Sequence, residues 1–303
     1  MKKFISLALV FVMALSCMAI FGACNKEESL SAAYDKAMKK IDYDPADYTD
    51  TLVVAMSPDF APMEFYDTAK TGDDAIVGFD VILATFIAKE LGKKLVIDPM
   101  SFDASIAAVA SGNADLAISG ISWTAERAET FLISDYYVAG ENETEQILIT
   151  TKANAAKITA DMTDFSGLKI GAQGGSLQQL LVEEQLVTKG AKMELYENIN
   201  VAATALATGD IDALAVAFGN GEALANDTIV LSDYYFEVAE KYKNNVILLN
   251  KEDAELLADV NAALAKAMAA NLYDTWYEAC QIYAEVKTLD ELGYDDEGNK
   301  ITE

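Results

Sequence analysis

The sequence contains no histidine among its 303 residues. This absence excludes mechanisms that need an imidazole, including the Ser-His-Asp triad, Cys-His nucleophile pairs and the usual histidine zinc sites. Basic residues are also scarce, with 22 Lys and Arg against 49 Asp and Glu and a formal net charge of -27. Such a chain repels a phosphate backbone, so we expect no nucleic-acid partner. We also expect no cofactor and no metal site.

Cysteine is nearly absent as well. Two of the three cysteines, Cys17 and Cys24, lie close to the N-terminus, which leaves Cys280 as the only cysteine of the main body. An intrachain disulfide is therefore excluded there. Cys280 lies in a stretch typical of a helix, where we expect a small, buried side chain without chemical function.

The N-terminus has the layout of an export signal. Lys2 and Lys3 precede an apolar run that is at the short end for a membrane-spanning helix, so a retained anchor is the alternative to cleavage. Gly22 and Ala23 directly precede Cys24 and resemble a bacterial lipobox, although Phe21 stands where an aliphatic residue is usual. We therefore expect a signal peptide over 1–23, with lipidation at Cys24 and anchoring to the extracytoplasmic face of the cell membrane. Cys17 is the second candidate for lipidation, but it would leave an apolar end on the mature chain.

The length of 303 residues predicts about two domains. The hydrophobic content of 52% is too high for a disordered chain, so we expect these domains to be folded. Residues 24–50 are polar and acidic, and we expect a tether there, with a possible short helix around 32–38. Residues 291–303 are charged and are expected to form a flexible tail. The folded region lies between these two segments.

Strand and helix patterns alternate through this region. Apolar residues recur at helical spacing from Phe79 to Ile87, with Gly92 just past the end. Short apolar runs at 52–56, 95–97 and 116–118, together with a helical stretch at 103–111, complete a first unit. Short apolar strands separated by helices predict parallel pairing with both faces of the sheet covered.

A second unit of the same kind begins at residue 168, where a strand leads through a turn into an apolar helix over 177–187. The stretch 110–117 is echoed by 207–214, and each contains a helix end, a glycine, an aspartate and a strand. We therefore predict an α/β fold with two lobes of like construction. Ligands of open α/β sheets bind beyond the carboxyl ends of the strands, so two such lobes would enclose a cleft.

Four ordered motifs carry a family resemblance. They are Ser57-Pro58-Asp59-Phe60-Ala61-Pro62-Met63-Glu64-Phe65, Gly78-Phe79-Asp80-Val81, Ser119-Gly120-Ile121-Ser122-Trp123-Thr124-Ala125-Glu126-Arg127 and Ser134-Asp135-Tyr136-Tyr137. With Gly171-Ala172-Gln173-Gly174-Gly175-Ser176, they resemble the extracytoplasmic solute-binding proteins (family 3) of polar amino-acid ABC transporters over roughly residues 51–285.

This resemblance implies the type II periplasmic-binding-protein fold, in which two crossovers join the lobes. We place the crossovers near 139–149 and 240–248. Lobe 1 would then comprise 51–143 and a return segment over 244–290, and lobe 2 would comprise 144–243.

The resemblance also implies ligand contacts. Arg127 follows a strand end and would bind a carboxylate through its guanidinium, the alternative being a surface ion pair with Glu126 or Glu129. Ser119, Gly120 and Ser122 would offer hydroxyl and main-chain groups. Gly175 and Ser176 precede an apolar helix whose positive dipole end would face an anion.

Further ligand contacts are expected from the aromatic residues Phe60 and Phe65, as walls for the ligand's side chain, and from Gln173 of the second lobe. Tyr136 and Tyr137 are expected to pack beneath the crossover.

The chain departs from the family at two positions. Ser57 stands where members that bind cationic side chains carry an aspartate, and Ala217 stands where many members place an acid for the ligand's amino group. We expect Asp59 and Glu222 to supply the missing acids.

The implied function is capture of an amino acid, expected to be polar, by a monomeric lipoprotein that delivers it to the membrane subunits of an ABC permease. It is not expected to be an enzyme. The alternatives are an exported enzyme resembling cyclohexadienyl dehydratase, with Glu64, Asp59 or Glu222 as acid or base, and a ligand-sensing partner of a membrane receptor.

Overall fold

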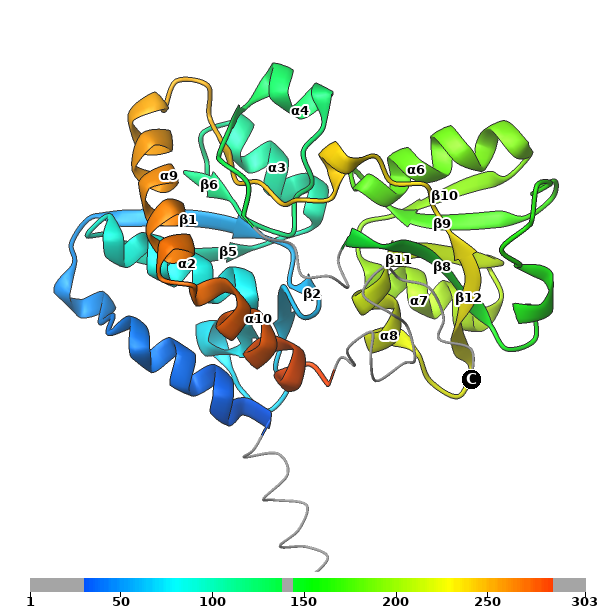
Figure 1. Cartoon of the computed structure of the whole chain (residues 1–303), viewed down its shortest axis with the longest axis horizontal. Coiled ribbons are helices and arrows are strands. Elements are labelled where there is room, and N and C mark those ends of the chain that lie inside the picture. Colours follow the sequence, from blue (N-terminus) through cyan, green and yellow to red (C-terminus); the bar gives the residue numbers. More distant parts are fainter. Residues whose placement is uncertain (1–29, 138–143, 286–303) are drawn as a thin grey trace, which may run out of the picture.

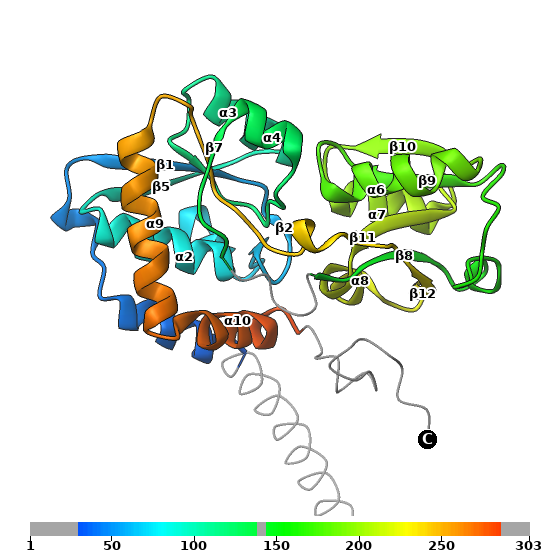
Figure 2. The ribbon, with the colours of Figure 1, turned by 45° about the horizontal axis from the view of Figure 1, so that its top comes forward.

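The chain folds into two α/β lobes that lie side by side (Figures 1 and 2). A computed structural model describes residues 30–137 and 144–285. The two-lobed α/β fold predicted from the sequence is confirmed. The signal segment with Cys17 and Cys24, and the tail after residue 285, lie outside the described residues. Within the described ranges, every helix is too short or too polar to span a bilayer.

The lobe 1 sheet has the strand order β5-β1-β6-β13-β7. These strands are β1 (Thr51–Met56), β5 (Lys94–Pro99), β6 (Leu116–Ala117), β7 (Leu132–Ile133) and β13 (Leu248–Leu249). β1 pairs in parallel with β5 and β6, as predicted, whereas β13 runs antiparallel to β6 and β7. The sheet is therefore mixed, because β13 belongs to the segment that returns from lobe 2.

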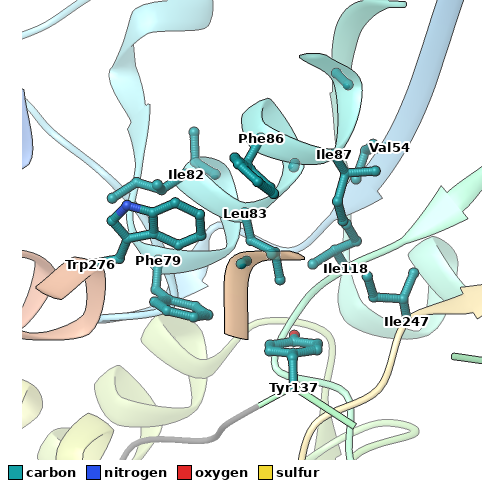
Figure 3. Close-up of a cluster of buried hydrophobic side chains, with 14 of the residues drawn as sticks. Val54, Phe79, Ile82, Leu83, Phe86, Ile87, Ile118, Tyr137, Ile247 and Trp276 are labelled. Carbon is teal, nitrogen blue, oxygen red and sulfur yellow. The ribbon is translucent and has the colours of Figure 1, made fainter. Parts of the chain in front are cut away.

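Besides the N-terminal helix over 30–41, five helices of the described residues pack around this sheet. They are α2 (Phe79–Glu90), α3 (Phe102–Ala110), α4 (Ala125–Thr130), α9 (Ala254–Ala269) and α10 (Leu272–Tyr283). A small sheet of β2 (Asp59–Phe60), β3 (Glu64–Tyr66) and β4 (Ile76–Val77) lies beside them, with the 3-10 segments η1 (Pro45–Asp47) and η2 (Gly72–Ala75). Phe79, Leu83 and Trp276 pack in the core between α2 and α10 (Figure 3). Cys280 is also fully buried in this core, as expected.

The lobe 2 sheet has the order β10-β9-β11-β8-β12. Its strands are β8 (Gln146–Thr151), β9 (Lys169–Gln173), β10 (Lys192–Tyr196), β11 (Ala213–Ala217) and β12 (Ile229–Tyr235). Its helices are α6 (Leu177–Gln185), α7 (Ile199–Thr208) and α8 (Phe218–Leu224), with the 3-10 segments η3 (Ala155–Lys157), η4 (Val187–Lys189) and η5 (Glu240–Tyr242). β9 is parallel to β10 and β11, and β8 is antiparallel to β11 and β12.

The repeat seen in the sequence is also a structural repeat. Gly112 and Gly209 follow α3 and α7 with φ of 74° and 82°, the left-handed conformation that glycine adopts without strain. After each glycine, an aspartate carboxylate accepts a hydrogen bond from a strand of its lobe, β1 in lobe 1 and β9 in lobe 2. Asp115 accepts from Val53 N at 2.8 Å, and Asp212 accepts from Lys169 N at 2.9 Å.

The described part of the expected tether belongs to lobe 1. Residues 30–41 form a helix whose Tyr34 and Ile41 side chains are buried in the lobe 1 core. The hydroxyl of Tyr43 accepts a hydrogen bond from Leu95 N at 2.6 Å and donates one to Lys93 O at 3.2 Å. The apolar residues of this segment, although few, lie on one face of the helix, which explains why it docks.

Tyr137 and Asn245 join the two segments of the chain that connect the lobes. Tyr137 N donates to Asn245 O at 3.0 Å, and the Tyr137 side chain is fully buried against Phe79, as predicted for a support beneath the crossover. The prediction for Tyr136 is wrong, because its side chain is 45% exposed. Neighbouring side chains of an extended segment point to opposite sides, so only one of the two can be buried.

Candidate ligand-binding site

A small cavity of about 30 Å³ lies between the two lobes. It is lined by Phe60, Phe102, Ser119, Gly120 and Ser122 of lobe 1, by Gln146, Gln173, Ser176, Leu177, Gln178 and Ile199 of lobe 2, and by Asn245 of the second crossover. This volume holds only about two water molecules. A larger ligand can enter only if the lobes move apart, which the two-crossover connection permits.

Arg127 joins the two lobes beside this cavity. The Thr124 side chain caps α4 by accepting from Arg127 N at 3.2 Å, which fixes the start of the helix. The guanidinium donates to Ser122 O of lobe 1 and, at 2.7 Å, to Gly175 O of lobe 2. It also lies 5.7 Å from the centre of the Phe102 ring, within cation–π range.

The Arg127 side chain is a buried cation without an acidic partner. The residue is 7% exposed, and within the described ranges its hydrogen bonds go to main-chain oxygens only. Burial lowers the pKa of the Arg127 guanidinium to about 10, so the group stays charged at neutral pH. A buried charge is costly unless an opposite charge approaches it, which makes this position suited to an anionic group of a ligand.

The N-terminus of α6 faces the cavity from lobe 2. Ser176 caps this helix by accepting from Gln179 N at 3.1 Å, and the Gln179 side chain accepts from Gly175 N at 2.7 Å. The first N–H groups of a helix have no partner inside the helix, so those of Leu177 and Gln178, both residues of the cavity wall, are available to an anion. Arg127 and α6 thus offer donors to one carboxylate.

Ser119 and Gly120 form the floor of the cavity with Phe60. The Ser119 hydroxyl is committed inside lobe 1, because it accepts from Ser57 N at 2.9 Å and donates to Glu64 Oε1 at 2.6 Å. Gly120 has φ of 54°, and a Cβ there would lie 2.5 Å from the Phe60 ring. The absence of a side chain at Gly120 is what allows Phe60 to lie across the cavity floor.

Two fully buried carboxyl groups, Glu64 and Asp80, lie beneath this floor. Asp80 Oδ2 accepts from Gly120 N at 2.7 Å and from the Tyr137 hydroxyl at 3.1 Å. Glu64 Oε2 and Asp80 Oδ1 each lack a separate donor among the described residues, and the two side chains are hydrogen-bonded to each other. A single proton shared between the two carboxyl groups would satisfy both oxygens. Burial raises the pKa of Asp80 to about 6, and burial together with Asp80 raises the pKa of Glu64 well above its usual value.

We predict that Asp80→Asn makes folding stability less sensitive to pH. The wild-type pair binds more protons folded than unfolded, so its contribution is full below about pH 4 and is lost as pH rises through 6. The free energy of unfolding falls by on the order of 1 kcal/mol per pH unit for each proton that the folded state binds in excess of the unfolded state. Asparagine keeps an oxygen for Gly120 and Tyr137 and places a permanent donor beside Glu64.

Urea unfolding from pH 4.5 to 7.5 measures this effect. The stability of Asp80→Asn relative to wild type should rise with pH, whereas Asp274→Asn, at an exposed position of α10, should show no trend. A constant difference between wild type and Asp80→Asn at all pH values would contradict the shared proton.

Asp59 connects the lobes on the other side of the cavity floor. Its Oδ1 accepts from the Ser57 hydroxyl at 2.8 Å, and its Oδ2 accepts from Ile199 N at 2.8 Å and Gln173 Nε2 at 3.1 Å. Ile199 is the first residue of α7, so the carboxylate also lies at the positive end of that helix. Asp59 is therefore an interlobe contact, fully supplied with donors.

The structure brings six of the predicted residues together in the cavity wall and leaves five outside it; the six are Phe60, Ser119, Gly120, Ser122, Gln173 and Ser176. Arg127 and Gly175 lie beside the cavity, joined by their hydrogen bond. Asp59 makes the interlobe contact just described. Phe65 packs edge-on against Tyr283 at 5.7 Å, in a separate groove. Glu222 is on α8 and does not line the cavity.

Sequence reasoning missed several residues of the cavity wall, namely Phe102, Gln146, Leu177, Gln178, Ile199 and Asn245. Leu177 and Gln178 directly follow Ser176, where the sequence predicts the start of a helix facing the ligand. The same prediction could have included them as cavity residues. Asn245 and Gln146 lie at the crossovers, outside every motif, and no sequence signal pointed to them.

Two lobes, two crossovers and an interlobe cavity beside a buried arginine define the class of two-lobed solute-binding proteins. Residues 52–279 match the model of the bacterial extracellular solute-binding proteins, family 3, and the chain belongs to this family. The family resemblance inferred from the sequence motifs is thus confirmed.

Individual relatives agree with this assignment. A probable histidine-binding protein of Campylobacter jejuni is 26% identical over 91% of this chain and 97% of the relative. The lysine/arginine/ornithine-binding periplasmic protein of Escherichia coli is 27% identical over 74% of this chain and 85% of the relative. An amino acid ABC transporter substrate-binding protein of Streptococcus pneumoniae, solved with L-arginine, has 31% identity and a TM-score of 0.66, covering 78% and 97% of the two chains.

Proposed function

We propose that this protein is a lipid-anchored receptor that captures an amino acid and delivers it to the membrane subunits of an ABC permease. The observation that carries the proposal is the buried, charged Arg127, which lies beside the interlobe cavity and contacts Gly175 just before the N-terminus of α6. That arrangement suits an α-carboxylate, and the relatives named above are histidine-, lysine- and arginine-binding proteins. The remaining cavity wall would surround the rest of the ligand.

Closure of the lobes is part of the proposed function. Arg127 with Gly175, and Asp59 with Gln173 and Ile199, form hydrogen bonds between the lobes. A ligand that bridges the lobes would favour this joined state, and the permease would recognise it.

A thermal-shift panel of the twenty amino acids and their deaminated analogues tests the binding role. Binding to the folded state stabilises it by mass action, so at least one amino acid should raise the melting temperature. Stabilisation by deaminated acids alone would instead make the protein a receptor for carboxylic acids. The enzyme alternative has no support in the cavity wall, where the described residues include no carboxyl group.

The lipid anchor is tested at Cys24. In the native bacterial host, Cys24→Ala should remain unprocessed or be released from the membrane fraction, because the acylated thiol is absent, whereas Cys17→Ala should behave like wild type. Detergent partitioning of both variants measures this. Equal membrane recovery of both would overturn lipidation at Cys24.

A further inference from the structure

The Asn245 side chain has an unused hydrogen-bonding atom in the cavity wall. Asn245 is 5% exposed, and its Nδ2 is buried without a hydrogen-bond partner among the described residues. Its main chain is fixed by the bridges to Ser122 and Tyr137. A buried amide group that lacks a partner destabilises the folded state, so its position next to a ligand cavity points to a role in binding.

The polar side chains of the rest of the wall are uncharged. Within the described ranges, no Asp, Glu, Lys or Arg side chain lines the cavity, which instead contains the amides of Gln146, Gln173 and Gln178 beside that of Asn245. Gln178 Nε2 donates to Gln146 Oε1 at 2.6 Å, so these two amides hold each other in place. Primary amides donate and accept hydrogen bonds, and they match a partner group that does the same.

The described part of the cavity wall offers no carboxylate to a cationic ligand side chain. On the lobe 1 side, Asp59 already accepts hydrogen bonds from Ser57, Gln173 and Ile199. Glu64 is fully buried beneath the floor and bound to Ser119. A cationic ligand side chain enclosed by the cavity would therefore add a second positive charge to that of the α-ammonium without a counter-charge of its own, which is costly in a site closed to water.

We propose that Asn245 donates a hydrogen bond to the ligand's side chain and that the site selects an amino acid with an uncharged, hydrogen-bonding side chain, of the carboxamide or ureide class. This inference rests on the proposed amino-acid-binding function and deepens it. It assigns the site a preference for uncharged side chains, in contrast to a receptor for basic amino acids. Asn245 would be a specificity-determining residue on the crossover, where lobe closure brings it against the ligand.

L-citrulline and L-arginine form the decisive pair of probes, since they have nearly the same shape and differ in side-chain charge. Calorimetric titration of the wild-type protein should give at least about 10-fold tighter binding of L-citrulline than of L-arginine, and of L-glutamine than of L-glutamate. Tighter binding of L-arginine than of L-citrulline would overturn the inference while leaving the proposed function standing. Absence of binding by all amino acids would overturn both.

Variants at the crossover assign the effect to Asn245. Asn245→Ala should weaken binding of the neutral probe by about 10-fold, as expected for one lost hydrogen bond. Asn244→Ala, at the neighbouring amide outside the cavity wall, should change it by less than about 2-fold. Asn245→Asp should reverse the preference towards L-arginine by adding the missing counter-charge. Equal effects of Asn244→Ala and Asn245→Ala on binding, with unchanged melting temperatures, would overturn the role of Asn245.

Discussion

Replacement of Arg127 by alanine is expected to weaken amino-acid binding by at least about 100-fold. The guanidinium is the buried cation beside the cavity, and a charge-assisted pair with a carboxylate contributes on the order of 1.5–3 kcal/mol. Removing it also leaves the ligand's carboxylate enclosed without its counter-charge, which adds to the loss. The N-terminus of α6 would remain as a donor to the carboxylate, which explains why some binding should persist.

Arg127→Lys is the matched control. Lysine keeps the positive charge but cannot donate to Ser122 O and Gly175 O at once through a planar fork, so we expect an intermediate loss. Calorimetry with the amino acid that gives the largest thermal shift measures both variants. Melting temperatures without ligand should stay close to wild type. Wild-type affinity in Arg127→Ala would remove Arg127 from the site.

Gly78→Ala is expected to cause a large loss of stability, roughly 4 kcal/mol or more. Gly78 precedes α2 with φ of 131°, which L-residues rarely adopt, and a Cβ there would lie 2.3 Å from Met63 O and 2.9 Å from Glu64 Cα. Both contacts are with main chain that cannot swing aside. The strand that carries Glu64, and with it the cavity floor, would have to move.

Gly112→Ala is the control for this substitution. Gly112 also has positive φ, at 74°, but a Cβ there would meet no atom within 4 Å. Its cost should be only about 1–2 kcal/mol, from the left-handed backbone alone. Thermal unfolding should therefore show a drop of at least about 8 °C for Gly78→Ala and a much smaller one for Gly112→Ala. Equal drops would contradict the close approach at Met63.

The sequence predicted the elements whose patterns are local. The helical spacing of apolar residues from Phe79 to Ile87 corresponds to α2, and the echo of 110–117 in 207–214 corresponds to two helix ends with the same hydrogen bond from an aspartate. A helix buried on one face shows apolar residues at helical spacing in the sequence, and a strand buried on both faces shows a short continuous apolar run. The motif around Arg127 was recognised by its resemblance to the family, and the helix start at Ser176 by the apolar helix that follows it.

Long-range contacts could not be predicted in this way. The direction of Asp59, whether towards the ligand or towards Ile199 of the other lobe, depends on how the two lobes meet. The same holds for Asn245, which lies 118 residues after Arg127 on a crossover without periodicity. The docking of residues 30–41 depends on a few apolar side chains in a mostly polar segment, which composition alone could not reveal.

The central claim is that one amino acid binds between the lobes and contacts both. Hydrogen–deuterium exchange with and without the amino acid that gives the largest thermal shift tests this most directly, because it reports on each lobe separately. The account predicts simultaneous protection of residues 119–122 in lobe 1 and residues 174–178 in lobe 2, where the cavity wall is formed. Protection confined to one lobe, or protection only outside both segments, would contradict it.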